Sequence, residues 1–175
     1  MSGAHFKAVR ALPEEAETFA SIHAASWKAA YRDIFPPAYL AGFTPQKRAE
    51  VFRRHFGQGQ EESYLFYTGE KAEGIAILGP SWELDYPEEV GEICAFYFLP
   101  EAWGTGAAQK GLDFSLAYFV EKGYAGAVLW VLEENRRARR FYEKGGFSFD
   151  GTRREFRLER PYAEMRYFQK IAENE

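Results

Sequence analysis

The chain has 175 residues, enough for one domain and too few for two, and its 46% apolar and 18% aromatic content argues against disorder. A single cysteine argues against a disulfide scaffold or a four-cysteine zinc site, and a net charge of −4 gives no reason to expect a nucleic-acid partner. Because no apolar run suits a membrane span or a signal peptide, we expect one cytoplasmic domain over residues 1–175, with no membrane partner.

The first half of the chain predicts one strand, three helices and a hairpin. A strand over His5–Leu12 is stopped by Pro13, a residue that suits the first turn of a helix running to about Tyr31. Acidic residues follow this proline and interact favourably with the positive end of the helix dipole. The remaining elements expected here are helices at Ala38–Gly42 and Pro45–Phe56 and antiparallel strands at Ser63–Thr68 and Gly74–Gly79.

The second half alternates strands and helices after an acidic loop at Pro80–Glu89. A helix over Thr105–Lys122 has an apolar stripe and ends before Gly123, where a left-handed cap is expected. The other elements expected are strands at Val90–Phe98, Ala127–Leu132, Phe147–Leu158 and Ala163–Ile171, and a helix at Asn135–Lys144. This order predicts an α/β fold in which a mixed sheet carries helices on both faces.

A glycine-rich segment joins the strand at Val90–Phe98 to the helix that follows, with the sequence Trp103-Gly104-Thr105-Gly106-Ala107-Ala108. Small residues at a helix N-terminus let backbone N–H groups point at an anion, so a phosphate or pyrophosphate is the natural ligand. A Walker loop is excluded because Leu112 follows Gly111 where lysine is required, and a Rossmann fingerprint because Gln109 replaces the third small residue. The alternative is that the glycines only shape a tight turn.

Two segments resemble the GNAT superfamily of N-acetyltransferases. The glycine-rich segment is similar to that family's Arg/Gln-x-x-Gly-x-Gly/Ala loop, with matches at Gly106 and Ala108 and with Trp103 in place of Arg or Gln. The segment Asn135–Phe147 is similar to the family's Asn-x-x-Ala-x-x-Phe-Tyr-Glu-Lys-x-Gly-Phe pattern. The resemblance implies a mixed sheet of about seven strands with splayed strands four and five, acetyl-CoA as cosubstrate and no metal.

The resemblance also assigns residues to acetyl-CoA. The coenzyme would contact Asn135 and the backbone of Phe96 and Phe98, with the Phe98 N–H as an oxyanion donor. Asn135 suits an N-cap equally well, and one residue can do both. Tyr142 would be the acid that protonates the leaving thiolate, the alternative being a core tyrosine. The phosphate-binding residues would be Trp103, Gly104, Thr105, Gly106, Ala107 and Ala108.

Glu92 is the candidate base, because an attacking amine must lose a proton and burial near apolar neighbours would raise the pKa of this carboxyl. Alternatively it anchors a cationic substrate or faces solvent at the start of the strand. Cys94 is expected to be a small core residue, so direct attack in a ternary complex is favoured over an acyl-cysteine route. The arginines of the second motif, Arg136, Arg137, Arg139 and Arg140, are expected on a solvated face near the coenzyme's phosphates.

The acceptor side resembles a bacterial GNAT subgroup with a Ser-Trp-x-x-Ala-Tyr-Arg segment, which includes polyamine acetyltransferases. Here that segment contains Trp27 and Tyr31, which either wall an acceptor pocket or belong to the core. Acidic residues before Glu92 would give a negative mouth, which favours a small cationic amine; they are Glu83, Asp85, Glu88 and Glu89. The alternatives are a protein N-terminus or lysine as acceptor, or a non-catalytic acyl-CoA sensor. The oligomeric state stays open, with a homodimer as one option.

Overall fold

The computed structural model describes residues 4–86 and 88–171 of the chain. Within these residues the strands form one seven-stranded sheet in the order β1-β2-β3-β4-β5-β7-β6. The β4–β5 pair is parallel and the other neighbouring pairs are antiparallel, so the predicted mixed sheet is confirmed. The strands are β1 (Phe6–Arg10), β2 (Glu62–Thr68), β3 (Lys71–Pro80), β4 (Val90–Phe98), β5 (Gly126–Leu132), β6 (Ser148–Arg157) and β7 (Pro161–Lys170).

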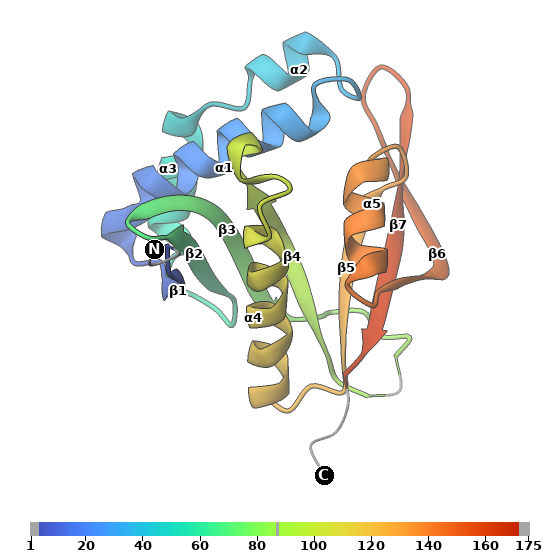
Figure 1. Ribbon diagram of the computed structural model, residues 1–175. Coiled ribbons are helices and arrows are strands. Elements are labelled where there is room, and N and C mark those ends of the chain that lie inside the picture. The colour runs from blue at the N-terminus through green and yellow to red at the C-terminus, as the bar shows by residue number, and fades with distance from the viewer. Residues whose placement is uncertain (1–3, 87, 172–175) are drawn as a thin grey trace.

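Helices cover both faces of the sheet, as expected (Figure 1). Phe19 of α1 and Phe52 of α3 share one buried apolar cluster with β2 and β3. Leu112 of α4 and Tyr142 of α5 belong to a second cluster on the opposite face. The helices are α1 (Ala16–Tyr31), α2 (Pro37–Ala41), α3 (Pro45–His55), α4 (Ala107–Glu121) and α5 (Arg136–Lys144).

Most element boundaries differ from the prediction by one to three residues, including the starts of α1, β3 and α4. The segment Pro13–Glu15 forms a 3₁₀ turn, and regular α-helix begins only at Ala16. β3 begins at Lys71 and not at Gly74, so the β2–β3 turn is shorter than expected. α4 begins after Gly106, because the φ of +90° at this glycine is left-handed and cannot belong to the helix.

β4 separates from β5 after the first third of its length. The two strands pair from Val90–Gly126 to Glu92–Val128, and beyond this point they diverge (Figure 1). A β-bulge lies at the same place, because Ile77 of β3 pairs with Ala95 of β4 while Leu78 pairs with Ile93. The divergence opens a gap between the carboxyl-terminal halves of the two parallel strands.

The extra residue in this bulge is Cys94, and its side chain is exposed. The prediction of a core cysteine is therefore wrong. Neighbouring side chains of a strand point to opposite faces, and the extra residue of a bulge has no partner on the adjacent strand, so Cys94 is exposed although Ile93 is buried.

His23 of α1 is buried among the rings of Phe43, Phe52 and Tyr97, and its Nδ1 has no hydrogen-bond partner in the described part of the chain. Burial, with a contribution from the nearby charge of Arg48, lowers the pKa of His23 to about 3. An unfolded histidine binds its proton near pH ~6.5, so on acidification the unfolded state takes up a proton before the folded state does. Folding stability therefore falls as the pH drops from about 6.5 towards 3.

We expect this single group to lower the free energy of unfolding by about 2 kcal/mol between pH ~7.5 and pH ~5. Urea unfolding of wild type and His23→Gln at both pH values measures the effect, because glutamine does not titrate. The loss on acidification should be smaller in the variant by that amount. Equal losses in the two proteins would contradict the assignment of the pH dependence to His23.

Candidate active site

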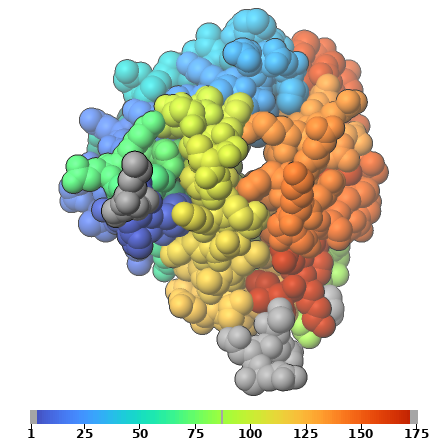
Figure 2. Space-filling view, viewed as in Figure 1, coloured from blue at the N-terminus to red at the C-terminus, as the bar shows by residue number. Residues whose placement is uncertain are grey.

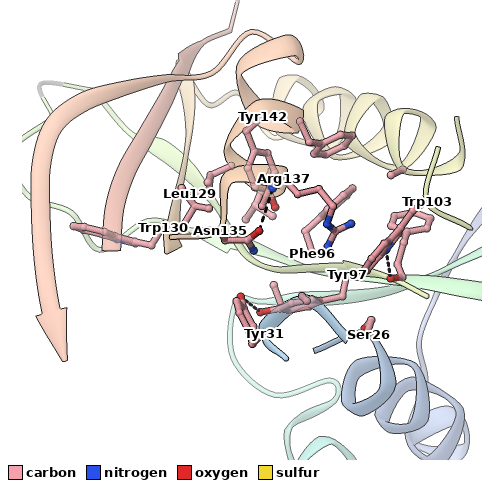
Figure 3. Close-up of a pocket in the computed structure, with 18 of the residues that line it drawn as sticks. Ser26, Tyr31, Phe96, Tyr97, Trp103, Leu129, Trp130, Asn135, Arg137 and Tyr142 are labelled. Carbon is pink, nitrogen blue, oxygen red and sulfur yellow. Dashed lines mark hydrogen bonds between the residues drawn. The ribbon is translucent and has the colours of Figure 1, made fainter. Parts of the chain in front are cut away.

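A cavity of about 240 Å³ occupies the gap between the diverging halves of β4 and β5. Figure 2 shows an opening between the yellow-green surface at the start of α4 and the orange surface of α5. Side chains of α1, β4, β5, α5 and the loop before α4 line the cavity (Figure 3). The two segments that carry the sequence motifs therefore meet on either side of one cavity.

The backbone of β4 has unshared polar groups on its β5 side. The Leu99 N–H donates to the carbonyl of Glu73 in β3 at 2.8 Å. Because successive residues of a strand direct their N–H and C=O groups to opposite sides, Phe96 and Phe98 direct theirs toward β5. Pairing with β5 has already ended at Glu92. The Phe98 carbonyl accepts the indole N–H of Trp103 at 2.9 Å. The Phe98 N–H and both backbone groups of Phe96 are thus directed toward the cavity.

The glycine-rich loop has the geometry of an anion-binding turn. Gly104 and Gly106 have φ values of +75° and +90°, a left-handed region that favours glycine. The Thr105 hydroxyl donates to the Ala102 carbonyl at 2.6 Å and accepts the Ala107 N–H at 3.3 Å, so this side chain fixes the turn. The first hydrogen bond of α4 runs from the Lys110 N–H to the Gly106 carbonyl. The N–H groups between Ala107 and Lys110 therefore have no acceptor within the helix. They are available to an anion, so the loop fits a pyrophosphate.

Tyr142 of α5 lines the cavity and is only 8% exposed. Its ring packs edge-on against Phe96 and Phe147. Burial raises the pKa of Tyr142 above its usual range, so its hydroxyl stays protonated at neutral pH. No hydrogen bond to this hydroxyl is found within residues 4–86 and 88–171, so it is free to donate into the cavity.

Asn135 precedes α5 and lines the same wall. Its Oδ1 accepts the Ala138 N–H at 3.2 Å, so the predicted N-cap is confirmed. Its side-chain amide group remains for a ligand, and contact with the coenzyme stays a prediction.

The two aromatic residues proposed for the acceptor side have different positions. Tyr31 lines the cavity, and its hydroxyl lies 3.0 Å from that of Tyr97 (Figure 3). Trp27 is not among the lining residues; its ring stacks on Phe43 at a centroid distance of 4.2 Å and belongs to an apolar cluster behind Tyr31. Trp27 therefore supports this wall of the cavity, whereas Tyr31 forms part of its surface.

Glu92 does not line the cavity and lies half-buried on β4, two residues before Cys94. Burial, and then the nearby charge of Glu83, raise the pKa of Glu92 above its usual range. Cys94 lines the cavity, and its enclosure there, followed by the charges of Glu92 and Glu61, raises the pKa of the thiol, which therefore stays protonated. A protonated thiol is a weak nucleophile.

The acidic loop before β4 does not form the predicted negative mouth, because none of its four acidic residues lines the cavity, and Arg166 of β7 binds two of them. The buried guanidinium of Arg166 lies 3.0 Å from Glu83 and 2.5 Å from Asp85, and it also binds Asp150 at 2.6 Å. Glu83 in turn accepts the indole N–H of Trp130, a residue that lines the cavity, at 3.0 Å. The exposed Glu88 and Glu89 precede the end of β4 that is still paired with β5, away from the gap.

Sequence reasoning did not single out Arg166 or Trp130. The one available signal for Arg166 is a charged residue between Met165 and Tyr167 in an apolar strand, where a buried partner is required. Trp130 gives no signal beyond its place in a compact strand.

A mixed sheet with one splayed parallel pair, and a glycine-rich turn beside the gap, defines an acyltransferase of the GNAT type. Residues 25–147 match the Acetyltransferase (GNAT) family, and the chain belongs to this family. It is an N-acetyltransferase that uses acetyl-CoA.

The comparisons with individual proteins agree with this assignment. An uncharacterized N-acetyltransferase of Mycobacterium tuberculosis (strain H37Rv) is 28% identical over 144 residues, which cover 82% of this chain and 89% of that protein. The fold is similar to the PaiA N-acetyltransferase from Thermoplasma acidophilum in complex with coenzyme A, with a TM-score of 0.72 and 18% identity over 95% of this chain and 99% of that one. It is also similar to the spermidine N-acetyltransferase from Vibrio cholerae in complex with CoA and spermine, with a TM-score of 0.71 and 18% identity over 95% of both chains.

Among the described residues, no three or more His, Cys, Asp or Glu side chains are grouped so that they could hold a metal ion. No helix in this part of the chain combines the length and the apolar character needed to cross a membrane.

Proposed function

We propose that the protein transfers the acetyl group of acetyl-CoA to the primary amine of a small cationic molecule, by direct attack in a ternary complex. The observation that carries this proposal is the cavity itself, which places the free Phe98 N–H and the protonated Tyr142 hydroxyl around one gap. Acetyl-CoA supplies the activated acetyl group. The loop before α4 binds its pyrophosphate, and Phe96 and Asn135 bind the arm that enters between β4 and β5.

The reaction requires two proton transfers and one oxyanion donor. The amine nitrogen forms a bond to the thioester carbonyl carbon, and the Phe98 N–H stabilises the oxygen that becomes negative. As the carbon–sulfur bond breaks, Tyr142 donates its proton to the thiolate. Glu92 takes the proton that the amine loses; because its carboxylate does not line the cavity, a bridging water is required.

Cys94 supports direct attack over an acyl-cysteine route. An acyl-cysteine would need a thiolate, whereas the cavity wall and two carboxylates keep this thiol protonated. The Glu61 carboxylate lies 3.9 Å from the Cys94 sulfur, and Glu92 is the second of these two carboxylates. Because Cys94 lines the cavity beside this pair, the two carboxylates also favour a cationic acceptor over an acidic one.

We expect Glu92→Gln to lower kcat/KM for the amine by roughly 100-fold, the usual contribution of a general base. In the wild type kcat/KM rises as Glu92 loses its proton, at a pH above the ordinary glutamate range because its pKa is raised. The variant should lack this step while its affinity for CoA stays unchanged. Glu155→Gln, an exposed glutamate of β6, is the matched control. If kcat/KM of the variant falls at low pH in the same way as that of the wild type, Glu92 is not the base.

The acceptor class is tested by following CoA release with polyamines, monoamines, amino acids and peptides that present a free N-terminus or lysine. Polyamines and other small cationic amines should be the best acceptors. Peptides as the best acceptors would replace this proposal with a protein acetyltransferase.

A further inference from the structure

Trp103 and Arg137 form a close stack across the mouth of the cavity. The Arg137 guanidinium carbon lies 3.3 Å from the centroid of the Trp103 ring. Trp103 belongs to the loop before α4 and Arg137 to the first turn of α5, and both residues line the cavity (Figure 3). The stack therefore joins the two walls that diverge with β4 and β5.

The indole is held firmly in this position. Its Nε1–H donates to the Phe98 carbonyl at 2.9 Å, which ties the ring to the end of β4. A guanidinium stacked through its flat face keeps its N–H donors free in the plane of the group. Arg137 thus presents charged donors to the cavity that Gly104 and Ala108 also line, next to the indole of the glycine-rich loop.

We propose that Arg137, stacked on Trp103, binds the pyrophosphate of acetyl-CoA. It takes the place of the arginine or glutamine that the loop lacks at position 103. The loop pattern that this segment resembles has arginine or glutamine at the position of Trp103, and an indole carries no charge with which to bind a phosphate. Arg137 restores a cation at this place from the opposite wall. This inference rests on the proposed binding of acetyl-CoA at the glycine-rich loop.

The test is calorimetric titration of wild type and Arg137→Ala with three probes. They are CoA, dephospho-CoA (which lacks the 3′-phosphate but keeps the pyrophosphate) and pantetheine, which has no phosphate and is measured by competition. Loss of a charge-assisted contact should lower the affinity for CoA and dephospho-CoA by roughly 10- to 100-fold and leave the affinity for pantetheine unchanged. Arg157→Ala, an exposed arginine at the end of β6 that does not line the cavity, is the matched control and should bind all three probes as the wild type does.

A second variant separates the charge from its location. Trp103→Arg in the Arg137→Ala background puts a cation back on the loop, and it should recover most of the lost affinity for CoA. If the double variant has the circular dichroism of the wild type but recovers no affinity for CoA, a cation at position 103 does not replace Arg137, and the proposal is contradicted.

Three results would overturn the assignment to the pyrophosphate. A loss with CoA but not with dephospho-CoA would place Arg137 at the 3′-phosphate. An equal loss with pantetheine would mean that Arg137 only shapes the cavity, and unchanged affinity for every probe would mean that it binds no phosphate. If the wild type itself binds CoA no better than pantetheine, the proposed place of the coenzyme at the loop fails as well, which distinguishes the two failures.

Discussion

Replacing Tyr142 by phenylalanine should lower kcat by roughly 100-fold, because the variant has no proton for the departing thiolate. The ring packs against Phe96 and Phe147 and would keep these contacts, so the affinity for CoA should stay within a factor of about three. Steady-state rates of CoA release and calorimetric binding measure the two quantities separately. A fall in kcat with unchanged binding is the signature of an interaction made only during the reaction.

The pH profile gives a second readout of the same residue. An acid must be protonated to act, and burial raises the pKa of Tyr142 above its ordinary value near ~10. Tyr142 should therefore cause no loss of activity on the alkaline side below about pH 10. The control is Tyr124→Phe, a partly exposed tyrosine outside the cavity, which should leave kcat unchanged. Equal kcat in wild type and Tyr142→Phe would remove Tyr142 from the mechanism.

The fold and the two walls of the cavity were predictable because their signals are local. Gly104 and Gly106 precede a helix, and the left-handed φ values of this loop require glycine. Asn135 stands directly before a helix and caps it. Alternation and helical periodicity place most element ends within a few residues of their observed positions, since both depend on neighbours in sequence.

Other features depend on pairing between distant segments, which no local pattern contains. The bulge at Cys94 is a mismatch between β3 and β4, and Ile93 and Ala95 give no sign of it in the sequence. Arg166 and Asp85 are 81 residues apart, so an acidic loop gives no sign that a buried arginine binds it. The same holds for Trp27 and Tyr31, which share one helix face although only Tyr31 reaches the cavity.

Replacing Arg166 by methionine should lower the free energy of unfolding by about 3–5 kcal/mol, the usual effect of removing one partner from a buried ionic group. The Arg166 side chain is 4% exposed, and its guanidinium binds Glu83, Asp85 and Asp150. Asp150 is the critical partner, because its side chain is only 16% exposed and would remain buried without a counter-charge. Urea unfolding measures the change, and the same midpoint in wild type and variant would contradict it.

The same substitution should also affect amine binding at the acceptor side of the cavity. Arg166 holds Glu83, and Glu83 holds the indole of Trp130, so loss of the arginine frees a ring that lines the cavity. We expect a raised KM for the amine with unchanged affinity for CoA, because the loop before α4 takes no part in this chain of contacts. If Arg166→Met does not fold, Glu83→Leu tests the second step, since leucine cannot accept the Trp130 N–H and leaves Asp85 and Asp150 bound to Arg166. An unchanged KM for the amine in Glu83→Leu would show that the position of Trp130 does not depend on this contact, and the stability effect of Arg166 would then stand alone.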